Sequence, residues 1–385
     1  MTHGLHATSC IEYDLRTISV NCDSANFTDL YETLNNSTLI GKESSKTWIL
    51  NANLTIQNGS SFYINSTDVD WLKVTSTANH SHKIESRGNL IIDSVKITGW
   101  DTAKKDYPLT DKEGNAPRGY IIIKRGTGDT NITNSEIGYL GYHRGESFGL
   151  TYYTGGGSLL KNNKIHDLYY GFYSDNHVGG LTIENNQFYN NTVYGIDPHS
   201  GTHDMLIKNN KVYQNGKHGI ICSTDCHNIH IESNKVFDNA NEGIMLFQNV
   251  SNSTINNNVL YGNREQIVLH VFSNNNTVHN NTVTGGKVGI RVNTGSSSNL
   301  IYDNIIRNSD YGIYVLQGAS NNVIDSNIIT SALKSAIHVQ DNNTKNNIFK
   351  DNLLLDNHNG IKYSNTTKKE AAFFNNTVGN TTNVQ

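Results

Sequence analysis

An asparagine recurs along most of this chain at a nearly constant spacing, and a second column with the same period accompanies it. After a first step of 29 residues, every spacing between successive asparagines is 23 to 25 residues. These asparagines are Asn134, Asn163, Asn186, Asn210, Asn234, Asn258, Asn281, Asn304, Asn327, Asn352 and Asn376. The second column is a Gly or Ala followed by an apolar residue, at Gly171-Phe172, Gly195-Ile196, Gly219-Ile220, Gly243-Ile244, Gly289-Ile290, Gly312-Ile313, Ala336-Ile337 and Gly360-Ile361, and Gln266-Ile267 keeps its register. A fixed period of this length is typical of a repeat architecture whose units stack on one another.

Short apolar clusters fill each repeat, such as Leu206-Ile207, Val212-Tyr213 and Ile220-Ile221, and polar Asn, Gly, Ser and Asp separate them. They predict strands of about three to five residues bounded by turns, without the 3.6-residue period of a long helix. Three such strands and three turns fill about 24 residues, which is one coil of a parallel β-helix. Asn suits the recurring turn because it tolerates the left-handed conformation and because stacked amides can bond along the column. We therefore predict an all-β solenoid with coils of about 24 residues.

The repeat does not reach the N-terminus, which predicts three segments. Residues 1–117 lack the Asn and Gly register, and we interpret them as an N-terminal cap with irregular first coils, or alternatively as a small separate domain. Residues 118–363 carry the regular β-helix repeats. Residues 364–385, rich in Asn and Thr, are expected to form a last coil or a tail.

Composition limits the partners and the cellular setting. The net charge of −4 gives no basic footprint, so a nucleic-acid partner is not expected. No apolar run approaches the roughly 18 residues of a membrane span, and the first residues lack the apolar core of a signal peptide. The chain is then either cytoplasmic or begins after a removed signal. We favour the second, which predicts an exported monomer at the cell surface, outside the cell or in the periplasm.

Four cysteines occur as two closely spaced pairs, Cys10/Cys22 and Cys222/Cys226. Two disulfides would indicate an oxidising compartment, whereas Cys222 can equally be a buried thiol within a strand. The cysteines lack the second CxxC and the closely spaced histidines of a zinc site, so we expect neither a metal nor a cofactor.

One stretch departs from the repeat, because residues 193–200 concentrate groups that can transfer or stabilise protons. Alignment on the Gly column places Tyr194 between Tyr170 and His218, Asp197 between Tyr173 and Ile221, and His199 between Asp175 and Ser223. Each has a simpler interpretation: an aromatic ladder for Tyr194, a turn for the Asp before Pro198, and a surface histidine for His199. Pro inside a repeated strand nevertheless needs a local reason. A row of polar side chains along a solenoid predicts binding of an extended polymer, here a polysaccharide.

The run Tyr194-Gly-Ile-Asp-Pro-His199, followed by residues 200–203 and by Lys217-His-Gly-Ile-Ile221, resembles the mannuronan C5-epimerases. Residues 169–173 and 139–142 extend the similarity, which covers roughly residues 95–310. The resemblance implies a right-handed parallel β-helix that converts mannuronate to guluronate within alginate. It implies that His199 and Tyr194 form the proton-transfer pair, in an order left open, and that Asp197 is also required.

Chemistry agrees with these roles, because removing the weakly acidic C5 proton requires a base, an acid and neutralisation of the adjacent carboxylate. This chain departs from the family where some members have a cation, at Thr224 and at Tyr173. The residues expected to contact the substrate are Tyr170, Tyr173, Asp175, His203, Lys217, His218, Arg118 and Lys124, and Arg125 is a further candidate cation. The calcium-binding nonapeptide GGxGxD of secreted members is absent from the sequence.

The sequence leaves three functions open. The first is C5-epimerisation of an anionic polyuronate. The second is a polyuronate lyase, which shares the proton abstraction and then expels the 4-linked sugar. The third is a non-catalytic surface β-helix that binds glycans. Glycosidase chemistry would need two carboxylates about 5 to 10 Å apart, a spacing that Asp175 and Asp197 in adjacent coils can approach.

Overall fold

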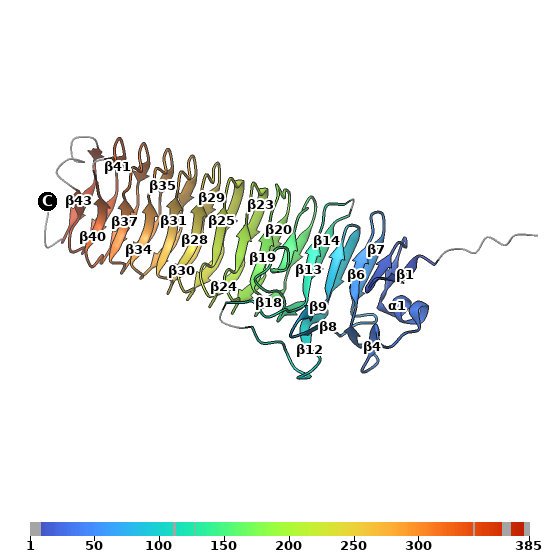
Figure 1. The fold of residues 1–385 in the computed structure, drawn as a ribbon. Helices are drawn as coiled ribbons and strands as arrows, with labels where there is room; N and C mark the ends of the chain where they lie inside the picture. Colours follow the sequence, from blue (N-terminus) through green and yellow to red (C-terminus); the bar gives the residue numbers. More distant parts are fainter. Residues whose placement is uncertain (1–8, 111–112, 127, 342, 364–370, 381–385) are drawn as a thin grey trace, which may run out of the picture. The chain divides into compact units, whose positions relative to one another are not determined.

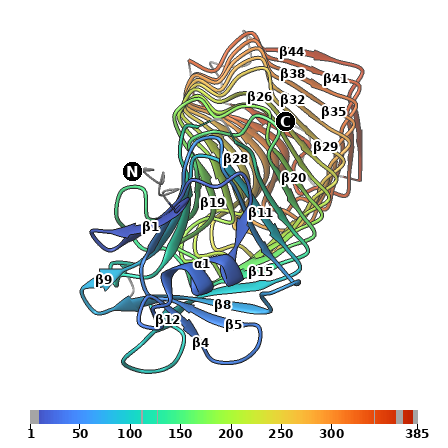
Figure 2. The ribbon, with the colours of Figure 1, turned by 90° about the vertical axis from the view of Figure 1, so that its right-hand side faces the viewer.

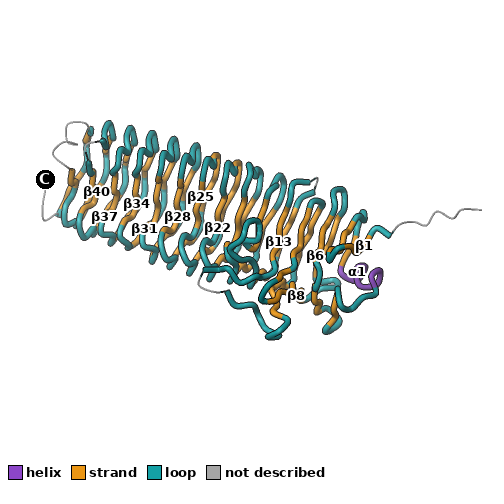
Figure 3. Tube along the Cα trace, viewed as in Figure 1, coloured by secondary structure: helices purple, strands orange, loops and turns teal. Residues whose placement is uncertain are grey.

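The structure is a computed structural model that describes residues 9–110, 113–126, 128–341, 343–363 and 371–380. It forms two compact units, residues 1–169 and residues 170–385, and each is described by itself. Within each unit, short strands alternate with turns and build three sheets, named A, B and C in the order in which a coil visits them. Figure 3 shows this alternation of short strands and loops.

The first unit contains the irregular coils expected near the N-terminus. Its sheet A consists of β1 (Ile11–Asp14), β2 (Thr17–Val20), β6 (Asn53–Ile56), β10 (Lys83–Ser86), β13 (Tyr120–Ile123) and β16 (Gly149–Tyr152). Sheet B consists of β3 (Ala25–Asn26), β7 (Ser61–Asn65), β11 (Asn89–Asp93), β14 (Thr130–Thr133) and β17 (Leu159–Lys161). Sheet C consists of β4 (Ile40–Lys42), β5 (Thr47–Leu50), β8 (Trp71–Thr77), β12 (Lys96–Asp101), β15 (Glu136–Gly138) and β18 (Lys164–His166), and β9 (His80–Ser81) pairs with β8. The pairs β1–β2, β4–β5 and β8–β9 are antiparallel, whereas successive coils pair in parallel.

The second unit is regular. Its sheet A consists of β19 (Tyr170–Ser174), β22 (Ile196–Pro198), β25 (Ile220–Ser223), β28 (Glu242–Phe247), β31 (Glu265–His270), β34 (Val288–Val292), β37 (Tyr311–Val315), β40 (Ser335–Val339) and β43 (Ile361–Tyr363). Sheet B consists of β20 (Thr182–Glu184), β23 (His203–Lys208), β26 (His227–Glu232), β29 (Thr254–Asn256), β32 (Thr277–His279), β35 (Leu300–Tyr302), β38 (Val323–Asp325), β41 (Ile348–Lys350) and β44 (Ala372–Phe374). Sheet C consists of β21 (Gln187–Tyr189), β24 (Lys211–Tyr213), β27 (Lys235–Phe237), β30 (Val259–Tyr261), β33 (Thr282–Thr284), β36 (Ile305–Arg307), β39 (Ile328–Thr330), β42 (Leu353–Leu355) and β45 (Thr377–Gly379). All these strands run parallel, and Figure 1 shows β28, β31, β34, β37 and β40 side by side.

The core of each coil is made by the inward-facing residue of each strand. Ile196, Ile220 and Ile244 occupy equivalent positions on sheet A of the second unit, and none is exposed to solvent. Burying each such side chain stabilises the fold by roughly 1.5–3 kcal/mol. The Gly column exists because the coils approach closely at that point. A Cβ on Gly195 would lie 2.5 Å from Val212 Cγ1 and 2.6 Å from the Gly219 carbonyl oxygen, so no larger residue fits there.

The asparagine column is a ladder of buried amides, as expected, but its left-handed residue is not the one predicted. Asn210 Nδ2 donates to Asn234 Oδ1 at 3.0 Å, and this bond repeats from coil to coil. The positive φ belongs to the residue before each ladder member, as at Asn209 with φ 56°. Asn134, with φ 52°, is such a residue, and Ser135 holds the ladder position by donating its N–H to Asn163 Oδ1. This one-residue offset explains the irregular first spacing.

Two further asparagine ladders line the other turns of the second unit. One runs through Asn191, Asn215, Asn239 and Asn263, and the other runs through Asn276, Asn299, Asn322 and Asn347. Only the first asparagine column is visible in the sequence, because Ser and other residues interrupt the other two. Buried side-chain amides bonded in this way satisfy backbone groups that tight turns would otherwise leave unpaired.

A short helix, α1 (Phe27–Leu34), lies at the N-terminal end of the first unit (Figure 2). Asn26 and Asp29 form a capping box that starts it, and its buried Phe27 packs against Phe62 and Trp48. This helix was not predicted from the sequence, because its eight residues are too few to establish a helical period. With that length α1 is far too short to span a bilayer, and the described residues contain no longer helix.

The two cysteine pairs behave differently. Cys10 and Cys22 form a disulfide, as one of the alternatives predicted. Cys222 and Cys226 are buried free thiols, which is the other alternative that the sequence left open for Cys222. Cys222 faces the core from β25, and the Cys226 thiol donates to the Ser223 carbonyl oxygen at 3.1 Å. Of the expected last coil or tail, residues 371–380 form β44 and β45, while 364–370 and 381–385 lie outside the described residues.

Candidate active site

The residues of the stretch 193–200 that the sequence singled out, with their neighbours in adjacent coils, gather on the outer face of sheet A in the second unit. Tyr173 on β19 pairs with Asp197 on β22, and His199 pairs with Ser223 in the next coil, which is the register expected from the Gly column. Side chains alternate along these strands, so Phe172 and Ile196 point into the core while Tyr173 and Asp197 point away from it. The fold therefore collects side chains from three successive coils on one surface.

Five aromatic rings on this surface form what we call the ring cluster: Tyr170, Tyr173, Tyr194, His199 and His218. Tyr194 stacks between Tyr170 and His218, with ring centroids 5.0 and 5.1 Å apart. Tyr173 joins the two ends, because its ring lies 5.5 Å from Tyr170 and 5.5 Å from His199. Stacking confirms the aromatic-ladder interpretation of Tyr194, and the same contacts bring it into one cluster with His199.

Burial keeps His199 in its neutral form. The side chain is half-buried, and this burial lowers its pKa below the ordinary value of 6.5, although the Asp175 carboxylate opposes the change. Its Nδ1 lies 2.6 Å from the Ser200 hydroxyl, which fixes the orientation of the ring. A neutral, oriented imidazole can accept a proton, so His199 has the properties of a general base near neutral pH.

Burial favours the protonated form of the Asp197 carboxyl. It is 2% exposed, and burial raises its pKa well above the ordinary value, with a further contribution from the Asp175 charge. The Ser223 hydroxyl donates to its Oδ1 at 3.1 Å, which opposes the increase without reversing it. A protonated carboxyl can donate a hydrogen bond, which an ionised one cannot.

A cation stands next to Tyr194. Lys217 Nζ lies 6.0 Å from the centroid of the Tyr194 ring, and the lysine is exposed. The ring also packs against the apolar cluster of Ile221, Met245 and Val268. A nearby positive charge stabilises an ionised phenol. Lys217 is therefore the predicted cation that the structure brings to the ring cluster.

His218 has a carboxylate partner that the sequence analysis did not identify. Its Nδ1 lies 2.5 Å from Glu242 Oε2, and both side chains are largely buried. Burial alone would raise the pKa of Glu242, but the hydrogen bond and the charge of His218 outweigh it and lower the pKa. Glu242 falls one coil after His218 in the same column, so alignment on the Gly column could have identified it. Ser200 and Ser223 were likewise missed as partners of His199 and Asp197.

His203 on sheet B and Arg118 in the first unit have other partners. His203 starts β23 on sheet B, stacks on His227 at 5.1 Å and contacts Asp204 through Nδ1 at 2.7 Å. Arg118 is 2% exposed and donates to two backbone carbonyl oxygens, those of Gly141 and Asp167. A guanidinium buried in this way supports the fold, which argues against the predicted contact with substrate.

Lys124 is an ion-pair partner within the first unit. Its Nζ lies 2.5 Å from Glu146 Oε1 and 5.0 Å from the centroid of the Tyr153 ring. The predicted cation Lys124 is therefore already paired with a carboxylate of its own unit. Among the residues that the structure describes, no group of three or more His, Cys, Asp or Glu side chains is placed to hold a metal ion.

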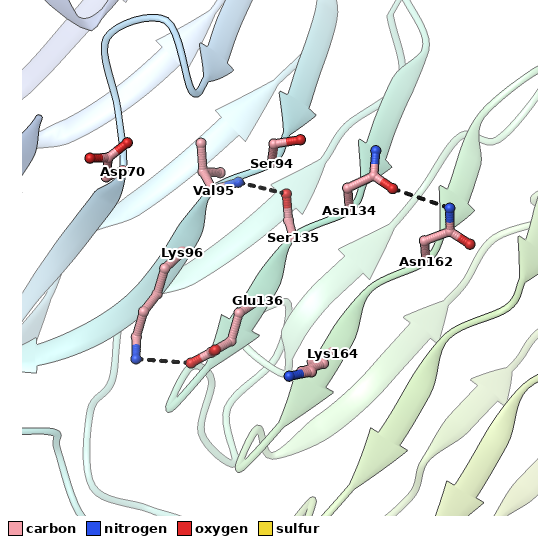
Figure 4. Close-up of a pocket in the computed structure, with 9 residues that line it drawn as sticks. All are labelled: Asp70, Ser94, Val95, Lys96, Asn134, Ser135, Glu136, Asn162 and Lys164. Carbon is pink, nitrogen blue, oxygen red and sulfur yellow. Dashed lines mark hydrogen bonds and ion pairs between the residues drawn. The ribbon is translucent and has the colours of Figure 1, made fainter.

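A separate polar hollow of about 360 Å³ lies in the first unit (Figure 4). Its lining includes an ion pair between Lys96 and Glu136, 2.9 Å apart, and the amides of Asn134 and Asn162, which bond to each other. It holds none of the residues that the sequence predicted for catalysis or substrate binding. Opposite charges that neutralise each other and amides that already bond to one another leave few groups there for chemistry.

Comparison with known proteins identifies the family. The sequence matches the family described as the right handed beta helix region over residues 17–236, 148–306 and 269–382, so the chain belongs to that family. No curated protein matches the sequence. The right-handed parallel β-helix and the coil length of about 24 residues are thereby confirmed.

Solved structures share the fold. The periplasmic alginate epimerase AlgG superposes with a TM-score of 0.77 at 20% identity, over 94% of this chain and 85% of that chain. A tailspike protein named Dettilon superposes with a TM-score of 0.51 at 15% identity, over 91% of this chain and 68% of that chain. At these identities the similarity establishes a common fold, and it leaves the activity to be argued from the site.

Proposed function

We propose that this protein binds an extended anionic polysaccharide along the outer face of sheet A and inverts C5 of its uronate residues. The proposal rests chiefly on one arrangement: a neutral His199 and a cation-flanked Tyr194 on the same coil, with a protonated Asp197 between them in sequence. His199 and Tyr194 belong to one ring cluster, because Tyr170 contacts Tyr194, Tyr173 contacts His199 and the two tyrosines contact each other. The resemblance of residues 194–199 to mannuronan C5-epimerases supports the same assignment.

In the proposed reaction His199 removes the C5 proton and Tyr194 returns a proton to the opposite face. The neutral imidazole accepts the proton, and the electron pair of the C5–H bond moves into the adjacent carboxylate. Asp197, as a protonated acid, donates a hydrogen bond to the oxygen on which negative charge grows. Tyr194 then donates its phenolic proton to C5, and Lys217 stabilises the resulting phenolate. The enzyme returns to its starting state when the proton on His199 is passed back to Tyr194 through solvent.

Asp197 and Lys217 would stabilise the charge of the substrate carboxylate, a role that a cation has in some related sequences. Abstraction beside an ionised carboxylate requires that its charge be neutralised or hydrogen-bonded. The buried, neutral Asp197 is the kind of donor that works without a net charge, and it stands in the register of Tyr173, where some family members have a lysine. Epimerisation is therefore compatible with the absence of a cationic residue at positions 173 and 224.

The test is to incubate the protein with polymannuronate in deuterium oxide and to follow the H5 and anomeric protons by NMR. Epimerisation predicts guluronate signals with deuterium at C5, without the ultraviolet absorbance of an unsaturated uronate. His199→Ala and Tyr194→Phe are each expected to lower the rate at least about 100-fold, because general acid–base catalysis contributes that much. His230→Ala, at an exposed histidine of sheet B, is the matched control and should retain the wild-type rate.

Other outcomes would replace the proposal. Absorbance that rises with time would indicate elimination and a polyuronate lyase. Binding without either signal would indicate a non-catalytic glycan-binding protein. A wild-type rate in His199→Ala would contradict the assigned base even if epimerisation occurred.

We also propose that the chain works in an oxidising compartment outside the cytoplasm. The Cys10–Cys22 disulfide supports this, because disulfides persist mainly in exported proteins. Export would also bring the protein to the extended polysaccharides that it is proposed to modify.

A further inference from the structure

The outer face of sheet A repeats the tyrosine pair of the ring cluster farther along the second unit. Residues 170–173 read Tyr-Gly-Phe-Tyr, and residues 311–314 read Tyr-Gly-Ile-Tyr in the same register of the coil. Six coil steps separate β19 from β37, which corresponds to about 29 Å along the solenoid axis. The second pair also has a histidine in the next coil, His338 on β40.

These residues form a compact group that we call the distal cluster: Arg291, Tyr311, Tyr314 and His338. The rings of Tyr311 and Tyr314 lie 4.8 Å apart, and His338 lies 4.8 Å from Tyr314 and 5.2 Å from Tyr311. Arg291 is the register neighbour of Tyr314 on the preceding strand, β34. The distal cluster therefore combines a guanidinium with three rings, all on the outer face.

Arg291 is anchored from one side and partly open on the other. Its Nη2 lies 3.0 Å from Glu265 Oε2, and the side chains are 22% and 4% exposed, respectively. The buried Glu265 fixes the position of the guanidinium, and the side chain of Arg291 stays partly exposed to a ligand on the outer face. A guanidinium presents several donors in a plane, which suits a carboxylate.

Buried polar atoms without a partner accumulate at this place. Arg291 Nε, Glu265 Oε2, His338 Nδ1 and Ser335 Oγ are buried and have no hydrogen-bond partner within the described chain, although Glu265 Oε2 lies at ion-pair distance from Arg291 Nη2. Nearly all buried polar groups in proteins are hydrogen-bonded, so four such atoms on strands β31 to β40 mark a polar group that the chain itself does not satisfy. Because these atoms lie beneath the surface, a ligand would contact the partly exposed side chains of Arg291, Tyr311 and Tyr314 above them.

A purely structural aromatic ladder looks different in the same unit. Tyr189, Tyr213, Phe237 and Tyr261 on sheet C each contribute one ring per coil, and successive rings are nearly parallel, with interplanar angles of 9°, 5° and 17°. The distal cluster instead pairs two rings of one strand, Tyr311 and Tyr314, and adds Arg291 and His338 from the strands on either side. Coil-to-coil stacking alone does not produce that arrangement.

We propose that the distal cluster is a second binding site for uronate residues of the same polysaccharide chain, with Arg291 binding a carboxylate and the tyrosine rings contacting the sugar. The ligand class rests on the function proposed above. This site holds the chain without changing it, because the column of Asp197 is occupied here by Tyr314 and His338. A chain long enough to cover about 29 Å would engage both sites, and linkage of two sites raises the apparent affinity.

The experiment measures calorimetric binding of oligomannuronates of graded length to the His199→Ala protein, which holds them without turnover. Affinity should increase sharply once the oligomer spans both sites, and short oligomers should occupy two sites per chain. Arg291→Met is expected to lower the affinity for long oligomers at least about tenfold and to leave one site for short ones. Arg307→Met, at an exposed arginine of sheet C, is the matched control and should bind like its parent.

Two further measurements keep the result interpretable. Because Arg291→Met leaves Glu265 buried without its partner, the double variant with Glu265→Gln removes both charges, and circular dichroism confirms that it is folded. A neutral mannan oligomer should bind no better to the wild type than to Arg291→Met. Equal loss for the neutral polymer, or long-oligomer affinity unchanged by Arg291→Met, would overturn the second site.

The outcome is independent of the proposed reaction. If the wild type shows no turnover but oligomannuronates bind in an Arg291-dependent way, the epimerase proposal fails and the second site stands. If turnover is present and Arg291→Met leaves length dependence intact, the second site fails and the epimerase proposal stands.

Discussion

At the scale of single residues, Asp197 and His199 lie two positions apart on the outer face of sheet A, and burial favours the neutral form of both. The pKa of Asp197 is raised and that of His199 is lowered, so near neutral pH one is a proton donor and the other a proton acceptor. Asp175 acts on both in the same direction, because its negative charge favours the protonated form of Asp197 and of His199. The protonation of this short peptide is therefore adjusted by one carboxylate from the preceding coil.

Asp175→Asn is predicted to lower the pKa of His199 further, because it removes the negative charge that favours the imidazolium. A base works only when unprotonated, so if His199 is the proposed base, the acidic limb of kcat/KM should move to lower pH in this variant. NMR titration of the His199 ring protons measures the pKa directly, with or without activity. Asp238→Asn, at an exposed turn, is the control. An unchanged or raised pKa of His199 in Asp175→Asn would show that the two side chains do not interact.

The neighbours of the motif residues that the sequence identified are those whose positions follow from the register between coils. Once coils are aligned on the Gly column, the neighbours of Tyr194 and His199 follow from counting, which is why Tyr170, His218 and Asp175 were found. The roles of Arg118 and Glu242 were not predictable in that way. Arg118 binds carbonyl oxygens 23 and 49 residues away, so its burial depends on irregular loops that no period describes.

At the scale of secondary-structure elements, the turn asparagines keep the coils in register. Asn258 Oδ1 accepts from the N–H and the side-chain amide of Asn234, and its Nδ2 donates to the Ile231 carbonyl oxygen and to Asn281 Oδ1. One side chain thus satisfies groups in the coil before and the coil after. An equivalent bond pattern in each coil fixes how far the strands of sheets B and C can slide.

Asn258→Ala is predicted to lower the free energy of unfolding by about 2–4 kcal/mol, because it leaves several buried donors and acceptors without partners. Urea denaturation monitored by circular dichroism measures the change. Asn257→Ser is the matched control: Asn257 is the exposed left-handed residue of the same turn, and Ser233 and Ser326 hold that position in other coils. We expect it to cost less than about 1 kcal/mol. Equal destabilisation by the two variants would mean that the turn backbone, and not the ladder, supports the coil.

The regular coils were predictable and the irregular ones were not, for a physical reason. A period becomes visible when the same residue type is required at every repeat, as amide stacking and close backbone approach require Asn and Gly. The first unit has no such uniform requirement: its coils include α1, an antiparallel pair between β4 and β5, and the hairpin of β8 and β9. Local packing of Phe27 against Trp48 and Phe62 determines that end, and such contacts leave no periodic signal.

At the scale of the whole chain, the four cysteines combine a surface cross-link with buried thiols. The disulfide joins Cys10 to Cys22 at the start of the first unit, where chain ends would otherwise fray. Cys222 and Cys226 are fully buried in the second unit, and burial raises the pKa of both thiols. A protonated, inaccessible thiol is unreactive, because the thiolate is the nucleophile. This distribution suits a protein that folds in an oxidising environment without a second disulfide.

Thiol counting is predicted to give none in the native protein, two after unfolding and four after unfolding with reduction, as the sequence contains four cysteines. A chromogenic disulfide reagent in the presence and absence of guanidinium measures all three values. After unfolding, the double variant Cys10→Ser with Cys22→Ser should show two thiols with or without reduction. Its free energy of unfolding should fall by about 3 kcal/mol, because the loop between the two positions is no longer closed. If the unfolded, unreduced chain showed no thiol, Cys222 and Cys226 would be joined, and strand β25 would have to open to allow it. If the native chain showed two, the core beside Asp197 would be accessible to solvent, and the burial that keeps Asp197 protonated would be lost.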